Sequence, residues 1–366
     1  MLNRSMPGVV AVPRRKFLKK AGILAAGIPL AGGLFSAACG EGSTKASTTT
    51  AAAASSATSQ PPATARTANQ SGGLTSAQID EFHKKGVEAF LKNQSDPLTK
   101  GKGNQLLTPK LDGTVKVFDL TVDEVQWETK PGNLESSLGY NAMLPGPVLR
   151  ATEGETVRIN VKNNLKESTT VHWHGLYVPN NMDGVPYVNQ DPIQPGATFT
   201  YEFTLRNPGS HMYHSHHNAL DQVNRGLLGA FIVDPKDPSK YPAYDKEHIM
   251  ILNDTLLGFT INGKEFPATD AVVAAMGDRL LVRFMNEGLS HHPMHLHGLP
   301  MQIVAIDGWP LAQPYMCDTI DVAPGNRYDA LIECTEAGVW AFHCHVLSHA
   351  ESPQGMFGMV TALVIQ

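Results

Sequence analysis

Residues 340–356 read WAFHCHVLSHAESPQGM and place Cys344 directly between His343 and His345. The segment begins like a β-strand, in which successive side chains point to opposite faces. His343 and His345 then share one face of the strand, and Cys344 points to the other. Because histidine and cysteine are both metal ligands, this one strand can serve two metal centres that lie back to back.

Strand patterns continue on both sides of this segment. They are short stretches that alternate apolar and polar residues or are rich in Val, Ile, Thr and Phe, with Gly, Pro and Asn between them. A first block contains TVKVFDLTVDEVQWE, ETVRINVKNNL, TFTYEFTLR and GAFIVDP, and a second contains HIMILND, DRLLVRFMNEG, MQIVAIDG, RYDALIECT and MVTALVIQ. Two such blocks predict an all-β protein with two β-sandwich domains, which we place at residues 110–240 and 241–366.

The composition of the 366-residue chain agrees with this fold class. Charged residues make up 17% of the sequence, whereas it contains 33 glycines and 25 prolines, which favours a turn-rich β protein over a helical one. Hydrophobic residues make up 42%, enough for a sizeable core. A formal net charge of -5 gives no electrostatic reason to expect nucleic acid as a partner.

The first 39 residues predict an export signal. They contain PRRKFLKKAGILAAGIPLAGGLFSAAC, in which Arg14 and Arg15 precede a short apolar run. This pattern resembles a bacterial twin-arginine signal, so we expect a periplasmic or cell-surface location. Cys39 is either a lipid attachment site, which would tether the protein to a membrane, or part of an ordinary cleavage site.

Two further segments precede the strands. Residues 40–74 are rich in Ser, Thr and Ala, cannot bury enough apolar surface to fold, and predict a disordered linker. Residues 75–109 begin with LTSAQIDEFHKKGVEAFLKN, which predicts a short amphipathic helix with Thr75 or Ser76 as its N-cap. We expect this helix to pack on the body that follows.

Histidine is concentrated in four motifs, two in each block. The first block carries TVHWHG (170–175) and MYHSHH (212–217), and the second carries HPMHLHG (292–298) and AFHCHVLSH (341–349). Each motif contains two histidines separated by one residue, which a strand presents on one face. Imidazole binds copper, zinc, iron and nickel, but a zinc site uses only three or four ligands, fewer than these motifs supply. Metal binding explains the clustering better than packing does.

Cys344 can complete a metal site on its own face of the strand. With His292, His349 and Met356 it would offer two imidazoles, one thiolate and a weak axial thioether, which is the blue-copper arrangement. The backbone of Cys344 continues directly into its two neighbouring histidines. An electron taken up at this site therefore has a short covalent route to a second metal centre.

The four motifs resemble those of the multicopper oxidases, the family that includes the laccases. The resemblance covers about residues 110–366 and extends to NAMLPGPVLRATEGETVRINVKNNL (141–165) and MDGVP (182–186). It implies two cupredoxin-like Greek-key β-sandwich domains and four copper ions per chain, one of type 1, one of type 2 and two of type 3. The implied ligands are His292, Cys344 and His349 for type 1, His172 and His295 for type 2, and His174, His214, His216, His297, His343 and His345 for type 3.

The axial ligand of the type 1 copper is where the sequence departs from the family pattern. The family places this residue ten positions after the cysteine, where the chain has Gln354, and the expected Gly-Met pair ends two positions later. We interpret AESPQGM as a two-residue insertion in the ligand loop. Met356 is therefore our predicted axial ligand, and Gln354 is the alternative.

The resemblance implies an enzyme that oxidises phenols or aromatic amines at the type 1 copper and reduces dioxygen to water at a trinuclear cluster. Cys344 would carry the electrons and Asp183 in MDGVP would relay protons, although an Asp-Gly turn needs no such role. A second acid is missing at Ala350 unless Glu351 replaces it. The commonest laccases have three domains, but this chain resembles the two-domain, small-laccase branch with its type 1 copper in the second domain. That resemblance implies a homotrimer whose clusters join histidines of neighbouring subunits.

Other functions are distinguished by their metal sites. A cuprous oxidase would use thioethers, which favour Cu(I), although Met294, Met301, Met316 and Met359 lie among apolar strand residues typical of a core. A copper nitrite reductase would carry its type 1 cysteine in the first domain, where this chain has Ser215. An electron carrier would need only the type 1 ligands, and hence about one copper per chain instead of four. Cys317 and Cys334 are either a disulfide or buried free thiols.

Overall fold

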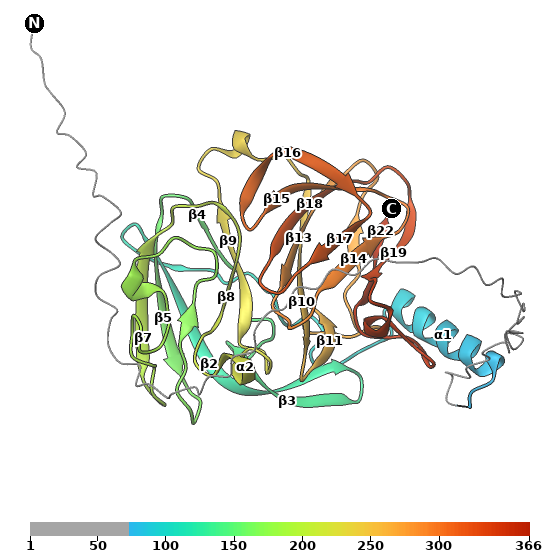
Figure 1. The fold of residues 1–366 in the computed structure, drawn as a ribbon, viewed down its shortest axis with the longest axis horizontal. Coiled ribbons are helices and arrows are strands. Elements are labelled where there is room, and N and C mark those ends of the chain that lie inside the picture. Colours follow the sequence, from blue (N-terminus) through green and yellow to red (C-terminus); the bar gives the residue numbers. More distant parts are fainter. Residues whose placement is uncertain (1–72) are drawn as a thin grey trace, which may run out of the picture. The chain divides into compact units, whose positions relative to one another are not determined.

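The computed structural model describes residues 73–366, in which the strands form two successive groups (Figure 1). The first group contains β1 (Lys110–Asp112), β2 (Val115–Lys130), β3 (Asn133–Tyr140), β4 (Leu149–Thr152), β5 (Thr156–Asn163), β6 (Val171–His172), β7 (Thr198–Thr204), β8 (Gly209–Ser215) and β9 (Leu228–Asp234). The predicted export signal at residues 1–39, and nearly all of the linker predicted at residues 40–74, lie outside the described residues.

The second group follows after a linker segment at residues 235–245. It contains β10 (Lys246–Thr255), β11 (Gly258–Ile261), β12 (Val272–Ala274), β13 (Arg279–Asn286), β14 (His292–Leu296), β15 (Met301–Ile306), β16 (Trp309–Cys317), β17 (Thr319–Val322), β18 (Arg327–Glu333), β19 (Gly338–Cys344), β20 (Glu351–Ser352), β21 (Gly355–Met356) and β22 (Val360–Ile365). The helices are α1 (Ser76–Leu91) and α2 (Ala219–Gln222), with single 3₁₀ turns at Asn180–Met182, Pro238–Lys240 and Leu347–His349.

Each group forms a β-sandwich. In the first, the sheet β1-β2-β5-β7, with β3 added beside β2, packs on the sheet β4-β9-β8-β6. In the second, β11-β10-β13-β18-β15-β16 packs on β12-β22-β19-β14-β17. The alternating burial along β5 shows why the sheets pack face to face. Val157, Ile159 and Val161 are fully buried between half-buried neighbours, and the burial of each side chain stabilises the fold by about 1.5–3 kcal/mol. The predicted all-β fold is confirmed, and the boundary at residues 240 and 241 stays a prediction.

Strand β9 joins the two sandwiches. Its sequence LGAFIVD is buried along almost its whole length, as is typical of a strand covered on both faces. Phe231 and Val233 belong to the core of the first sandwich. Ala230 and Ile232, on the other face, form a second apolar cluster with Met285 of β13. The two halves therefore pack directly against each other within one chain.

Helix α1 begins with a capping box. The Thr75 side chain accepts a hydrogen bond from the Gln78 backbone N–H, and the Gln78 side chain accepts one from the Thr75 backbone N–H. An N-cap of this kind stabilises a helix by about 1 kcal/mol. Phe90 packs on Phe266 of the second sandwich with ring centroids 5.3 Å apart, which confirms the predicted helix and its docking. No helix among residues 73–366 has the length and apolar character needed to cross a membrane.

The cysteines of the described segment are not cross-linked. Cys317 is half-buried at the end of β16, Cys334 is buried just after β18, and both are free thiols, as is Cys344. Of the two alternatives left open by the sequence, the structure has the free thiols.

Candidate metal centres

Cys344, His292 and His349 converge inside the second sandwich. Cys344 ends β19, His292 begins β14, and His349 ends the 3₁₀ turn that follows Cys344. The Sγ atom of Cys344 lies 3.8 Å from Nδ1 of His292 and 3.7 Å from Nδ1 of His349, and all three side chains are buried. Burial raises the pKa of the Cys344 thiol to about 11, so a stable thiolate here requires a neighbouring cation. One metal ion can be held by two imidazoles and this sulfur.

Two residues that the sequence interpretation missed hold these imidazoles in place. Asp254 lies 3.4 Å from Nε2 of His292 and accepts hydrogen bonds from the backbone N–H groups of Leu289 and Ser290 at 2.6 and 3.2 Å. Burial alone would raise the pKa of Asp254, but its bonds with His292 and the two N–H groups bring that pKa below its usual range. Phe259 stacks on His349 with ring centroids 4.2 Å apart. Both contacts orient a ligand, as supporting residues do in metal sites.

The axial ligand predicted from the sequence belongs to a different apolar cluster from Cys344. Met356 lies on β21 and packs with Phe266 and Ala350 beneath helix α1, and Gln354 is exposed at the tip of the same hairpin. Met359 instead belongs to the buried cluster that contains Cys344, and its carbonyl accepts a hydrogen bond from the Cys344 N–H at 3.0 Å. The assignment of Met356 as the axial ligand therefore stays a prediction, and Met359 is an alternative that the sequence interpretation did not consider.

The strand register explains why Met359 faces Cys344. His343 pairs with Val360 in the antiparallel ladder of β19 and β22, which sets Cys344 opposite Met359. Residues directly opposite in such a ladder project from the same face. On the other side Met294 of β14 pairs with Cys344, so fully buried methionines occupy the paired positions on both neighbouring strands.

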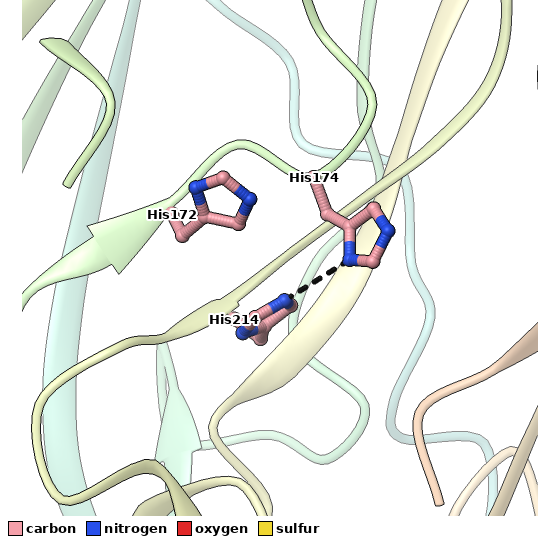
Figure 2. A group of neighbouring side chains, drawn as sticks. All are labelled: His172, His174 and His214. Carbon is pink, nitrogen blue, oxygen red and sulfur yellow. Dashed lines mark hydrogen bonds between the residues drawn. The ribbon is translucent and has the colours of Figure 1, made fainter. Parts of the chain in front are cut away.

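The first sandwich carries a group of histidines at the end of β6 and β8 (Figure 2). His172 and His214 are directly opposite in the ladder of β6 and β8 and project from one face, while Trp173 points into the core. His174 Nδ1 lies 3.2 Å from His214 Nε2, and the rings of His172 and His216 are 5.5 Å apart. The four histidines lie close together, and the ligand atoms of His172, His174 and His214 lie within 4.8 Å of one another.

Asp183 lies beside this group. Its backbone carbonyl is 2.8 Å from Nδ1 of His172, and its carboxylate Oδ1 is 3.4 Å from the same nitrogen. Asn189 donates a hydrogen bond to Oδ2 at 3.2 Å. Gly184 has φ +86° and packs against the Val171 carbonyl so closely that a Cβ atom would collide with it. The structure thus contains both the tight turn and an acid next to a candidate ligand.

A second group of histidines lies on the second sandwich. His295 pairs with His343 across β14 and β19, and their rings are 5.7 Å apart. His297 Nε2 lies 3.1 Å from His343 Nε2, and the ring of His345 lies 5.5 Å from that of His295. All four face away from the side on which Cys344 is buried, as the alternation predicted. His297 and His345 are exposed.

The two histidine groups remain separate within one chain. Between residues 73 and 366, ring contacts occur inside each group, and none joins a histidine of one group to the other. Glu351, the alternative second acid, lies 3.7 Å from His83 on α1 and thus faces the helix. Ser215, buried on β8, donates a hydrogen bond to Gln222 at 2.6 Å, in the place where a first-domain cysteine would be.

Family models described as multicopper oxidase match residues 121–238 and residues 241–364, which together span most of both sandwiches. The chain belongs to the multicopper oxidase family. The blue copper oxidase from Nitrosomonas europaea, a solved structure, is 31% identical with a TM-score of 0.64, over 69% of this chain and 86% of that chain. The fold of this multicopper oxidase is accordingly cupredoxin-like.

Curated relatives within the multicopper oxidases are longer than this chain. Copper resistance protein A of Escherichia coli is 42% identical over 137 residues, which are 37% of this chain and 22% of that protein. Laccase-1 of Cryptococcus neoformans is 30% identical over 243 residues, covering 54% of this chain and 38% of that protein. The chain thus spans less than half the length of either relative.

Copper is the cofactor of multicopper oxidases, and the donor atoms present suit it. Imidazole, thiolate and thioether side chains are typical ligands of copper, whereas carboxylate-rich sites favour calcium or magnesium. The Cys344 group supplies two imidazole nitrogens and a thiol. The two histidine groups supply eight further imidazoles, so both kinds of site fit copper.

Proposed function

We propose that this multicopper oxidase is laccase-like and couples the one-electron oxidation of phenols or aromatic amines to the four-electron reduction of dioxygen to water. The observation that carries the proposal is the back-to-back arrangement on β19. Cys344 contacts two buried imidazoles on one side, while His343 lies with other histidines on the opposite side. A simple electron carrier would need the first site alone. An exported location, directed by Arg14 and Arg15, belongs to the same proposal.

Copper bound at these sites would supply the one-electron redox chemistry and the binding of dioxygen. The side chains of the protein determine the route of the electrons and the surroundings of the metal sites. Cys344 would bind copper through its sulfur. Its backbone leads directly to His343 and His345, which favours electron transfer between the sites on the two faces of β19. His292 is fully buried, which keeps water from the electron-accepting site. Asp183 can hold a proton 3.4 Å from His172 and pass it toward the histidine group.

We assign four copper ions per chain, one of type 1, one of type 2 and two of type 3, with the ligands given by the family motifs. For the axial ligand we propose Met359, five residues beyond the family position at Gln354, as the alternative to the predicted Met356. Its burial, its pairing opposite Cys344 and its presence in the same cluster support this choice. Met294 pairs with Cys344 on the other strand and is a second buried methionine on that face of the sheet.

Met359→Leu is expected to shift the blue absorption band and raise the reduction potential of the type 1 copper, since leucine removes the weak thioether ligand without changing the core volume much. Met356→Leu is the matched control and should leave both unchanged, because Met356 packs under α1. Visible spectroscopy and a redox titration measure the effect. A shift in the control variant alone would return the axial role to Met356.

The separation of the two histidine groups supports a homotrimer in which the group on one subunit meets the other group of its neighbour. Each group supplies four imidazoles, and a trinuclear cluster with eight histidines requires both. His216, His297 and His345 are exposed on the single chain, as expected for ligands completed by a partner. Cyclic symmetry would then form three equivalent clusters per trimer.

Subunit mixing tests this arrangement. His172→Ala and His295→Ala variants should each be inactive alone, because every cluster in each trimer lacks one ligand. Trimers re-formed from an equal mixture should regain a substantial part of the oxidase activity, since some interfaces pair an intact first half with an intact second half. Oxygen uptake before and after mixing measures this. Failure to recover activity in trimers shown by mass to be mixed would place each cluster within one chain.

A cuprous oxidase is the second candidate, favoured by the 42% identity to a protein named for copper resistance and by Met316 on β16, a residue that is 57% exposed. Thioethers favour Cu(I). Oxygen uptake with Cu(I) and with 2,6-dimethoxyphenol, compared as kcat/KM, separates the two functions. Met316→Leu should lower the value for Cu(I) only if the cuprous reaction is the principal one.

A further inference from the structure

A cavity of about 370 Å³ lies where the linker segment between the two sandwiches, residues 235–245, passes over the second sandwich. Leu281 of β13 and Val304 of β15 line its floor, and Pro238, Tyr241 and Tyr244 of the linker line its walls. None of the candidate copper ligands takes part. The cavity is therefore a separate feature at the junction of the two halves.

The floor of the cavity is apolar on the outer face of a sheet. Leu281 and Val304 alternate with core residues of β13 and β15 and therefore point out of the sandwich. With Leu331 of β18 they form a small buried cluster of their own, against which Tyr244 packs. Outward positions on a sandwich are usually polar. These apolar side chains are thus suited to contact something other than their own core.

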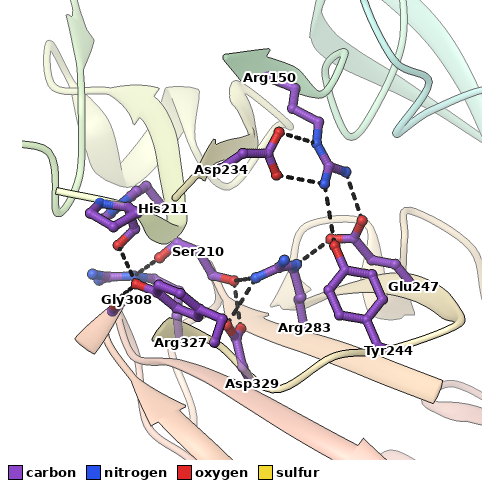
Figure 3. Close-up of polar contacts among 12 residues, drawn as sticks. Arg150, Ser210, His211, Asp234, Tyr244, Glu247, Arg283, Gly308, Arg327 and Asp329 are labelled. Atoms are coloured by element: carbon purple, nitrogen blue, oxygen red, sulfur yellow. Dashed lines mark hydrogen bonds and ion pairs between the residues drawn. The ribbon is translucent and has the colours of Figure 1, made fainter. Parts of the chain in front are cut away.

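The charged groups at the edge of the cavity are already paired (Figure 3). Arg283 donates hydrogen bonds to Asp329 at 2.9 Å and to Glu247, and Asp329 also accepts one from Ser210. Arg283 and Asp329 are almost completely buried, with side chains 7% and 3% exposed. Separating such a pair is strongly unfavourable, because it leaves a buried charge without its partner.

A second ion pair closes the other edge. Asp234, which lines the cavity, accepts two hydrogen bonds from Arg150 at 2.7 and 2.9 Å, and Arg150 also donates to Glu247 at 2.6 Å. Every charged side chain along the cavity thus has an opposite charge in contact with it. A charged ligand would have to compete with one of these pairs, so the cavity favours a neutral molecule.

Tyr241 supplies the polar contact that a neutral ligand could use. Its hydroxyl donates toward the carbonyls of Pro208 and Gly308, at 3.2 and 3.4 Å, so its oxygen keeps the capacity to accept a hydrogen bond. The tyrosine rings and proline provide flat apolar walls of the kind that pack on an aromatic ring. A cavity of about 150 Å³ holds benzene, so one of this size has room for two fused rings.

We propose that this cavity is a binding site for a neutral two-ring aromatic molecule that carries a hydroxyl group. The rings would lie on Leu281 and Val304 between the linker tyrosines, and the hydroxyl would donate to Tyr241. The site does not depend on the proposed oxidase function, because it shares no residue with the copper ligands. The cavity proposal can therefore be wrong while the oxidase function is right, and the oxidase function can be wrong while the cavity proposal is right.

Titration calorimetry with 2-naphthalenemethanol tests the site. This alcohol is neither a phenol nor an amine, so the copper-loaded protein can be used without oxidising the probe. We expect saturable binding of one molecule per chain with a Kd below about 1 mM. The similarly sized 2-naphthoate and 2-naphthylmethylammonium ions should bind at least about tenfold more weakly. Absence of saturable binding, or tighter binding of either ion, would overturn the proposal.

Two variants locate the binding. Ala243 lies on the exposed rim of the cavity, so Ala243→Trp should fill the mouth without disturbing the core and weaken binding at least about tenfold. Leu111→Trp adds the same ring at an exposed position on β1 and should leave binding unchanged. Equal binding in the wild-type protein and the Ala243→Trp variant would show that the probe binds elsewhere and would refute the assignment.

Discussion

The Cys344→Ser variant is expected to lose phenol oxidation completely, together with the intense blue absorption at about 600 nm that a copper thiolate produces. Serine has nearly the same size, but its hydroxyl does not replace the thiolate as a copper ligand or as the start of the electron route to His343 and His345. Oxygen uptake with a phenol and the visible spectrum measure both losses. Circular dichroism should show the β-sheet content unchanged.

A matched control for this variant is Cys334→Ser. Cys334 is a free thiol, 1% exposed, in the same buried cluster as Cys344, but it belongs to none of the metal sites. The control should keep its blue colour and its activity, which separates loss of a copper ligand from the general effect of placing a hydroxyl in the core. Measurable turnover in Cys344→Ser would contradict the proposed electron route.

His295→Ala is expected to abolish oxygen reduction while preserving the blue band, because His295 lies with the exposed histidines and not with Cys344. Its Nδ1 is held 3.0 Å from the Asp318 carbonyl and 2.9 Å from the Thr319 hydroxyl, which aims the remaining nitrogen at the histidine group. The variant should bind about three copper ions per chain where the parent binds four. Metal analysis and oxygen uptake measure the two effects.

His291→Ala, at the position directly before the same motif, provides the comparison. His291 is exposed, its Nδ1 lies 3.0 Å from the Asp321 carboxylate, and it is none of the candidate ligands, so its removal should change neither the copper content nor the turnover. If His295→Ala retained normal turnover, the assignment of the trinuclear cluster would be wrong. Equal losses in both variants would point to a structural effect on β14.

The placement of the two kinds of ligand on opposite faces of β19 could be predicted from the sequence because it depends only on local geometry. Alternation along a strand sends His343 and His345 to one side and Cys344 to the other, whatever the neighbouring strands are. Helix α1 was likewise predictable, since residues 75–78 have the sequence pattern of a capping box.

The axial ligand could not be placed by counting residues. Between His349 and Met359 the chain forms the small hairpin of β20 and β21, and Met356 on this hairpin packs in an apolar cluster with α1. Only the ladder of β19 and β22 shows which methionine faces Cys344. An insertion of unknown length hides that register from the sequence.

Asp254 and Phe259 were missed for a different reason. They lie 90 and 85 residues before Cys344, on β10 and β11, in segments that carry no metal-binding motif. Their roles arise only because the second sandwich brings these strands beside His292 and His349. Tertiary contacts of this kind leave no periodic signal in a single sequence.

The most direct test of the central claim is the copper content per chain of the purified protein, measured together with its visible spectrum after oxidation. The account predicts about four copper ions, an intense blue band at about 600 nm, and a near-ultraviolet shoulder from the coupled copper pair. One or two copper ions per chain in the fully loaded protein, with a blue band and no shoulder, would contradict it. That result would leave an electron carrier or a nitrite reductase in place of the oxidase.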